Sequence, residues 1–167
     1  AEGHHNNVKC LSRQFRAKRV DVDSVYLTKG ELRAMMEADL SQLSRLHELS
    51  RDIFMVGVYT AQRVSDYNNI APENIIMQPD GQMMIRLRQR KTGTWVSVPV
   101  KEELRQILVK YDYRLPHVAE QAINSCIKEV ARVAGIDELV TVESTVGGVL
   151  HLETRPKYSL IQSHTAR

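Results

Sequence analysis

The hydrophobic period of this chain changes twice, and this change restricts the possible folds more than any other feature. Apolar residues recur at helical spacing up to residue 61, alternate with polar residues between 74 and 100, and then return to helical spacing. The alternating segments read NIIMQ, QMMIRLR and TWVSVPV, and the PDG and QRKTG between them are typical of turns. The pattern predicts a mainly helical α+β fold with a small three-stranded antiparallel sheet.

Two helices are expected before this sheet. Thr28 and Glu31 form a capping box, with Leu27 placed as a hydrophobic staple, so a first helix should run to about Ala38. The segment LSRLHELSRDIFMVGVYTA repeats apolar residues at helical spacing and predicts a second, longer helix. RVSDYNNI, which follows it, predicts a tight turn or a short helix.

After the sheet the chain returns to helices and then to extended structure. Helices are expected over residues 101–111 and 117–135, the second one ended by a capping glycine. Residues 139–161 are rich in β-branched side chains and broken by glycines, which predicts extended or hairpin structure. Ser163 has the character of an N-cap, so a last helix is expected to begin there.

Positive charge is concentrated in two places. The net charge is only +3, but basic residues gather in two short segments. They are Lys9, Arg13, Arg16, Lys18 and Arg19 in the first segment, and Arg86, Arg88, Arg90 and Lys91 in the second. Such clusters suit a polyanion such as DNA or RNA, although two solvated surface runs would give the same pattern. Residues 1–24 are interpreted as a basic linker or arm, with AEGHHNN at its start resembling a tag remnant.

Cysteine content and hydropathy exclude several classes of protein. Cys10 and Cys126 lie far apart in dissimilar contexts, which indicates free thiols in a reducing compartment rather than a disulfide framework or a zinc site. No apolar run approaches the ~18 residues needed to span a bilayer, so no membrane segment is expected. The first residues are polar, and no secretory signal is recognised there.

Three short motifs carry side chains suited to chemistry. TAQRVSD places Arg63 directly after a long helix, with Asp66 three residues further on. QRKTG places Lys91 at a hairpin tip, and SHTAR places His164 and Arg167 on one face of a helical turn. Each position has an ordinary alternative: a cap of the preceding helix for Arg63, an N-cap for Asp66, and exposed loop or first-turn residues for the other three.

In this order the motifs resemble the catalytic domain of the tyrosine recombinases, or phage integrase family, over about residues 26–167. In that family an arginine follows a helix in T-G-x-R-x-S-E/D, a lysine sits on a β-hairpin before Thr-Gly, and a helix opens with H-x-x-R. YTAQRVSDYNNIAPENI, RKTGTWVSVPV and SHTAR are particularly similar to integrases of conjugative transposons. Lys91 is preferred to Arg90 because it directly precedes Thr-Gly, and Ala61 stands where the family has glycine.

The resemblance implies a fold of the DNA breaking-rejoining type and a role for each of these side chains. A tyrosine would attack a DNA phosphodiester and form a transient 3′-phosphotyrosyl link, as in site-specific recombination or integration. Arg63 and Arg167 would clamp the non-bridging phosphate oxygens, and Lys91 would protonate the leaving 5′ oxygen. His164 would contact the phosphate and assist proton transfer, while Asp66 would hold Arg63 in place. No metal or other cofactor is implied.

The resemblance also implies partners and a location. Double-stranded DNA would be bound by both basic segments, the complete protein would act as a homotetramer on two DNA sites, and this chain alone would be a monomer. The expected location is the bacterial cytoplasm, at the nucleoid when DNA is bound, as part of a mobile element. Trp95 is interpreted as a packing residue rather than a base-stacking one.

The family's tyrosine, and a further His or Trp, follow the H-x-x-R segment. Neither is found after it here, so residues 25–167 are interpreted as a catalytic domain incomplete at its C-terminus and unable to cleave DNA alone. Tyr158 precedes that segment and is not expected to be the nucleophile. The alternative is a DNA-binding module that keeps the fold without cleavage, and a more distant one is a helical protein–protein module.

Overall fold

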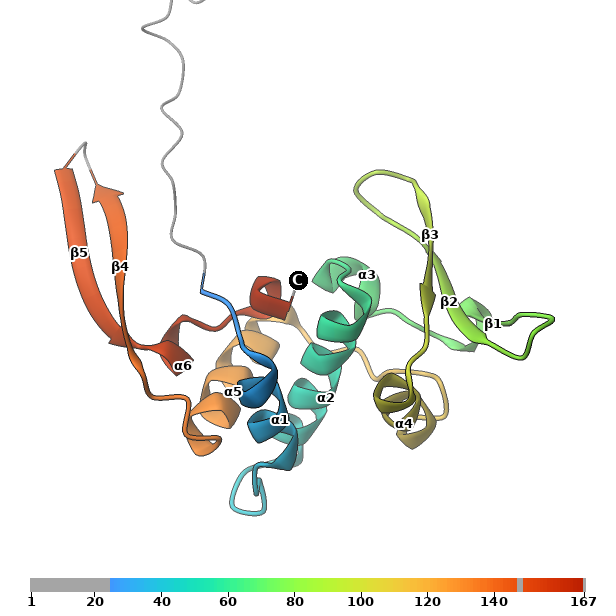
Figure 1. The fold of residues 1–167 in the computed structure, drawn as a ribbon, viewed down its shortest axis with the longest axis horizontal. Helices are drawn as coiled ribbons and strands as arrows, with labels where there is room; N and C mark the ends of the chain where they lie inside the picture. Colours follow the sequence, from blue (N-terminus) through green and yellow to red (C-terminus); the bar gives the residue numbers. More distant parts are fainter. Residues whose placement is uncertain (1–24, 147–148, 167) are drawn as a thin grey trace, which may run out of the picture.

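The computed structural model describes residues 25–146 and 149–166 of the chain. The basic segment over residues 9–19 and the predicted catalytic Arg167 lie outside this part. Helices form the centre of the molecule, with a small sheet on one side and a long hairpin on the other (Figure 1). None of the helices in the described part combines the length and the apolar character needed to span a bilayer.

Four helices of the described chain have two or more turns. They are α1 (Lys29–Glu37), α2 (Arg45–Thr60), α4 (Glu102–Lys110) and α5 (Glu120–Val133). α2 packs on α5 through the main hydrophobic core, where Phe54 of α2 and Ile127 of α5 are fully buried. The helical part of the fold is therefore organised around α2, as its length and apolar content predict.

Local signals set some helix boundaries and distant contacts set others. Glu31 N–H donates to the Thr28 hydroxyl at 3.2 Å, and Thr28 N–H donates to the Glu31 carboxylate at 2.7 Å, which confirms the predicted capping box. α5 begins at Glu120, later than the sequence predicts. The reason is that the Asn68 side-chain amide donates to the Val118 carbonyl at 2.6 Å, which holds this segment outside the helix.

The predicted three-stranded antiparallel sheet is confirmed. It follows two short helical turns, and its strand order is β1-β2-β3. The turns are α3 (Val64–Tyr67) and η3 (Pro72–Asn74), and the strands are β1 (Ile75–Met77), β2 (Met83–Arg88) and β3 (Trp95–Pro99). Ile85 and Leu87 are buried, whereas Arg86 and Arg88 on the same strand are exposed. One face of the sheet therefore completes the core and the other carries the arginines.

A second hairpin forms where extended structure is predicted. β4 (Leu139–Val146) pairs antiparallel with β5 (Val149–Pro156), and the pair leads into α6 (Lys157–Leu160). The prediction of extended chain as far as residue 161 is thus wrong at its end. The Ser159 hydroxyl donates to the Pro156 carbonyl at 2.7 Å, which stabilises this helical turn.

Candidate active site

Arg63 lies at a sharp change of direction between α2 and α3. Ala61 ends α2 in the left-handed conformation, with φ 52°, and donates its N–H to the Gly57 carbonyl at 2.8 Å. Glycine is the usual residue for this conformation, which explains why the related motif carries glycine at the position of Ala61. Arg63 is the N-cap residue of α3, so it does not cap α2. Its half-buried guanidinium has no hydrogen bond or ion pair with any described residue.

A close contact fixes this corner against the end of the described chain. A Cβ atom placed on Gly57 would lie 2.6 Å from the Tyr67 ring and 3.1 Å from the Ala166 side chain. Only glycine at this point of α2 therefore allows α3 and the segment before Arg167 to approach so closely. Tyr67 is fully buried, and this burial, together with the charge of Glu120, raises the pKa of its phenol.

His164 lies on a short turn that two side chains of α5 hold in place. The turn is η4 (Ser163–Ala166), a 3-10 turn rather than the α-helix predicted to begin at Ser163. Ser163 does not act as the expected N-cap. Its hydroxyl donates to Glu120 at 2.5 Å and its N–H donates to the Asn124 side chain at 2.7 Å, so both polar groups are directed to α5. His164 itself is exposed beside this anchor.

Arg63 and His164 line the same pocket, although they are far apart in the sequence. The pocket has a volume of about 340 Å³. Its lining residues are Gln62, Arg63, Val64, Ser65, Glu120, Ser163 and His164. The pocket holds the Arg63 guanidinium, which has no partner among the described residues and can bind a small anionic group such as phosphate. The Glu120 carboxylate lines the same pocket and accepts from the Ser163 hydroxyl.

The turn that carries Lys91 is attached to the segment around Arg63. The Gln89 side chain donates to the Gln62 side chain at 2.7 Å, and the Arg90 N–H donates to Asp66 Oδ1 at 2.9 Å. Lys91 follows directly and is exposed, with no hydrogen bond or ion pair to the rest of the described chain. The structure thus places the Lys91 turn beside the Arg63 segment, while Lys91 does not line the pocket itself.

Asp66 contacts a different partner from the one predicted. It is buried on α3, and its carboxylate accepts from the Arg90 N–H at 2.9 Å and from the Ser65 hydroxyl at 3.5 Å. Its backbone N–H donates to the Arg63 carbonyl at 2.8 Å, but the described residues show no contact between the Asp66 carboxylate and the Arg63 guanidinium. Asp66 Oδ2 is buried without a partner there. The Asp66 side chain therefore joins α3 to the hairpin. It was expected to hold the Arg63 guanidinium, and it contacts the hairpin backbone instead.

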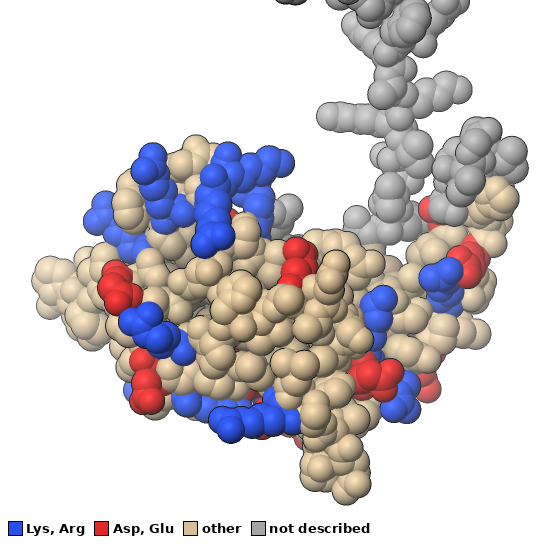
Figure 2. All heavy atoms as spheres, turned by 180° about the vertical axis from the view of Figure 1, so that it is seen from behind, with Lys and Arg blue, Asp and Glu red and all other residues tan. Residues whose placement is uncertain are grey.

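The exposed face of the sheet is basic. Figure 2 shows Lys and Arg side chains gathered over the β2–β3 hairpin, where Arg86, Arg88, Arg90 and Lys91 are all exposed. The Arg86 guanidinium lies 5.0 Å from the centre of the Trp95 ring, a cation–π distance. Trp95 is 58% exposed, so it packs against Arg86 on the surface of the hairpin and not in the core. It forms, with Arg86, a flat cationic surface on the hairpin.

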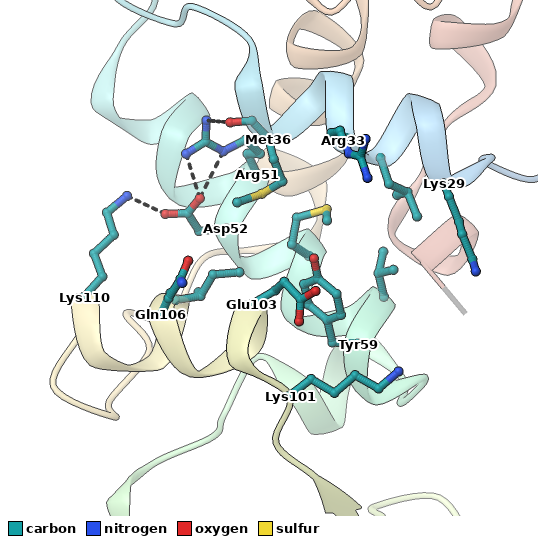
Figure 3. A pocket seen from close by; sticks show the side chains of 14 residues that line it. Lys29, Arg33, Met36, Arg51, Asp52, Tyr59, Lys101, Glu103, Gln106 and Lys110 are labelled. Carbon is teal, nitrogen blue, oxygen red and sulfur yellow. Dashed lines mark hydrogen bonds and ion pairs between the residues drawn. The ribbon is translucent and has the colours of Figure 1, made fainter.

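A larger pocket, of about 650 Å³, lies elsewhere, between α1, α2 and α4 (Figure 3). Its buried carboxylate, Asp52, accepts hydrogen bonds from Arg51 at 2.9 Å, Lys110 at 2.5 Å and the Tyr111 hydroxyl at 2.9 Å. Burial and the nearby charge of Asp52 raise the pKa of Tyr111 to about 12. Because Asp52 is fully matched by these partners, this network ties the helices together and is not our candidate active site.

Four residues of the site region are absent from the predictions made on sequence. Gln62 and Gln89 join the two motif segments, and Glu120 and Asn124 hold the turn of His164. Glutamine, glutamate and asparagine are common on surfaces, and each contact joins segments distant in the sequence. Only Gln62 and Gln89 lie within the quoted motifs TAQRVSD and QRKTG, which was the one indication in the sequence of their place near the site.

Comparison with known proteins is informative for the fold. No protein-family model and no curated protein sequence matches this chain. Nine chains of solved structures match, among them the XerH site-specific recombinase bound to palindromic difH substrate in a post-cleavage complex. That match has a TM-score of 0.53 and 13% identity, and covers 68% of this chain and 37% of XerH.

A pre-cleavage complex of XerH bound to difH substrate gives a TM-score of 0.54 at 10% identity, covering 93% of this chain and 46% of XerH. The chain therefore spans less than half the length of these recombinases. At such low identity the likeness concerns the fold alone. It shows that this α+β chain shares the fold of site-specific recombinases, as the sequence motifs predicted.

Proposed function

We propose that this chain is the catalytic part of a site-specific DNA recombinase that cleaves and rejoins DNA through a transient 3′-phosphotyrosyl link. One observation carries the proposal. Arg63, whose guanidinium has no partner among the described residues, and His164 line one pocket, and the turn of Lys91 is hydrogen-bonded to the segment that carries Arg63. The fold shared with XerH, which the solved complexes contain bound to its DNA substrate, supports the same function.

The arginine suits the charge that develops during the reaction. Attack on a phosphodiester gives a pentacoordinate transition state in which the non-bridging oxygens gain negative charge. The planar guanidinium of Arg63 can donate two parallel hydrogen bonds to such oxygens, which a lysine ammonium cannot. Arg167 is proposed as a second clamp, on the basis of the motif, since it directly follows Ala166 at the contact with Gly57. Catalysis would come mainly from positioning and electrostatic stabilisation.

Two proton transfers accompany the bond changes. The attacking tyrosine loses its proton as the bond from its oxygen to phosphorus forms, and the 5′ oxygen gains a proton as its bond to phosphorus breaks. We assign the first transfer to assistance by His164 and the second to Lys91 as general acid. His164 is exposed at the pocket and Lys91 is exposed at the hairpin tip, so both could reach a bound DNA backbone.

The basic hairpin face would bind the DNA around the cleaved phosphate. Arg86, Arg88 and Arg90 are exposed there, and Trp95 broadens the surface beside Arg86. Phosphate contacts of this kind give affinity that falls steeply with salt concentration. The basic residues 9–19 are proposed to add contacts from the linker. Action as a homotetramer, a role in a conjugative transposon and a location in the bacterial cytoplasm belong to the same proposal.

A DNA-binding module without cleavage activity is the second candidate, and the exposed Arg86–Trp95 surface favours it equally. It gives no reason for a half-buried Arg63 beside His164 that no other described side chain pairs with. The two candidates therefore differ in what Arg63 does after DNA is bound, since only the recombinase uses this side chain in the chemistry.

The proposal is tested with Arg63→Ala and Arg63→Lys in the complete gene product. Both variants should lose cleavage of a nicked suicide DNA substrate by at least about 10²-fold, because one clamp on the transition state is lost. DNA binding measured by anisotropy should change only a few-fold. Arg33→Ala is the matched control, because Arg33 is an exposed arginine of α1 that lines the other pocket. Cleavage of Arg63→Ala at the rate of Arg33→Ala would refute the proposed function.

A further inference from the structure

A chain of side-chain hydrogen bonds runs from the end of α2 to the turn that carries Lys91. Gln62 Nε2 donates to the Thr60 carbonyl at 3.1 Å, and Gln62 Oε1 accepts from Gln89 Nε2 at 2.7 Å. Gln89 Oε1 in turn accepts from the Thr92 hydroxyl at 2.8 Å. Both ends of both side-chain amides are thereby used, on a path that begins beside Arg63 and ends beside Lys91.

The orientation of each amide in this chain is determined by its neighbour. A backbone carbonyl can only accept, so Gln62 must present its NH₂ group to Thr60 and its oxygen to Gln89. Gln89 must then present its NH₂ group to Gln62, which leaves its oxygen for Thr92. Rotation of either amide would bring two like groups face to face, so the contact has a single favourable arrangement.

A backbone contact reinforces this chain on the other side of the turn. The Arg90 N–H donates to the buried Asp66 carboxylate at 2.9 Å, and the Gly93 N–H donates to the Gln89 carbonyl at 2.8 Å, which closes the turn. Lys91 therefore lies between residues that are held on both sides. Its backbone has a defined position relative to the Arg63 segment, while its side chain remains exposed.

The chemical nature of the contact suits a site that binds phosphate. Arg63, Arg90 and Lys91 are positively charged, and an ion pair in their midst would compete with a DNA phosphate for these charges. The amide–amide bond between Gln62 and Gln89 is neutral. It can persist while phosphate occupies the pocket, and salt screens it far less than a contact between charges.

We propose that Gln62 and Gln89 are positioning residues that hold Lys91 at the leaving 5′ oxygen of the phosphate bound by Arg63. This inference rests on the proposed function. Neither glutamine needs to touch DNA for it to hold. Their loss would displace the ammonium from the leaving group, and a displacement of about 1 Å can reduce a rate by about 10²-fold.

The test compares two DNA substrates, one with the natural 5′ bridging oxygen and one with sulfur in its place. A thiolate leaves without protonation, so sulfur removes the need for a general acid. In the complete gene product, Gln89→Ala and Gln62→Ala should cleave the oxygen substrate about 10- to 100-fold slower than the wild type and the sulfur substrate at nearly the wild-type rate. Because both remove one contact, the double variant should be no slower than either single one.

The controls separate this inference from the proposed function. Gln106→Ala on α4 removes an exposed glutamine that lines the other pocket and should leave both rates unchanged. Lys91→Ala should be rescued by sulfur, and a failure of that rescue would remove Lys91 as the general acid and with it part of the proposed function. If Lys91→Ala is rescued while both glutamine variants are normal on oxygen, or equally slow on both substrates, the positioning inference is overturned.

Faster hydrogen exchange at the Arg90 amide in Gln89→Ala would show that the turn has loosened while the chain remains folded. Gln62→Ala and Gln89→Ala remove the same hydrogen bond from different segments of the chain. If one variant fails to fold, the other still tests the inference. Unchanged exchange at Arg90 in both variants would contradict the claim that the glutamines hold this turn.

Discussion

The two hairpins of this molecule differ in how they are attached to the rest of the fold. The β2–β3 hairpin buries Ile85 and Leu87 against the core, and Gln89 near its tip is bonded to Gln62. The β4–β5 hairpin extends away from the helices (Figure 1), and its Leu139 and Leu152 are 67% and 63% exposed. Among its described side chains, none is buried.

This difference decides what each hairpin can do. A group that protonates a leaving oxygen must be held to within about 0.5 Å of its productive position. The first hairpin has a buried face and contacts near its tip, so it can hold Lys91 in this way. The second is attached mainly at its base, where Lys157 after β5 contacts Glu31 of α1 at 2.7 Å. The described side chains further along it have no hydrogen bond or ion pair with the helices.

The largest difference is expected in activity. Lys91→Ala should slow cleavage of ordinary DNA by about 10²–10⁴-fold in the complete gene product, as for loss of a general acid. Arg155→Ala on β5 removes an equally positive, solvent-exposed side chain and should change the rate less than about twofold. Single-turnover cleavage measures both. Comparable losses in the two variants would show that the hairpins do not differ as described.

The next difference is expected in stability. Ile85→Ala should lower the free energy of unfolding by about 2–5 kcal/mol, because it opens a cavity in the core. Leu152→Ala should change it by less than about 0.5 kcal/mol, since this side chain is largely exposed. Urea denaturation of the two variants tests the pair. A large loss in Leu152→Ala would reveal a buried contact of the second hairpin.

A smaller effect is expected from acid at the base of the second hairpin. Burial alone would raise the pKa of Glu31, but hydrogen bonds from Lys157 and Thr28 outweigh it and hold that pKa below 4.5. Glu31 therefore contributes stability that is present above about pH 4.5 and is lost as pH falls through its lower, folded-state pKa. The contribution should be about 1 kcal/mol at most.

Thermal unfolding of the wild type and of Glu31→Gln between pH 3 and pH 7 measures this contribution to stability. Glu31→Gln should lose part of the dependence of stability on pH. Glu37→Gln is the control, since Glu37 is an exposed carboxylate on the same helix that makes no ion pair with any described residue. An unchanged pH profile in Glu31→Gln would contradict the assignment.

The smallest change in stability is expected at Ala61, at the end of α2, beside the segment that is bonded to the first hairpin. Ala61→Gly should stabilise the chain by about 0.5–1 kcal/mol, because glycine adopts the positive φ of this position without strain. Ala34→Gly in the interior of α1 is the matched control and should destabilise by about 1 kcal/mol. Denaturant midpoints compare the two, and destabilisation by both would show that Ala61 is not strained.

The sequence predicted those features that depend on neighbouring residues. The capping box of Thr28 and Glu31, the turns around Gly81 and Gly93, and the alternation along β2 are all local, and all are found in the structure. The path of the chain at Ser163 is different. Its conformation depends on Glu120 and Asn124, which no local pattern connects to it.

In the candidate site, too, the sequence predicted some features and not others. The motifs identified Arg63, Lys91 and His164, and the pocket brings the first and the last of these together. The partner of Asp66 could not be predicted, because a buried carboxylate three residues after an arginine can instead accept from a backbone N–H of another segment. The packing of α3 against the hairpin determines which donor the Asp66 carboxylate contacts.

The central claim is that Arg63 stabilises negative charge on the phosphate that is cleaved. Its most direct test replaces one non-bridging oxygen of that phosphate by a methyl group, which makes the linkage neutral. The cleavage rates of wild type and Arg63→Ala are then measured on both DNAs. Arg63→Ala should lose at least about 10²-fold on the natural phosphate and much less on the neutral one. An equal loss on both would contradict the central claim.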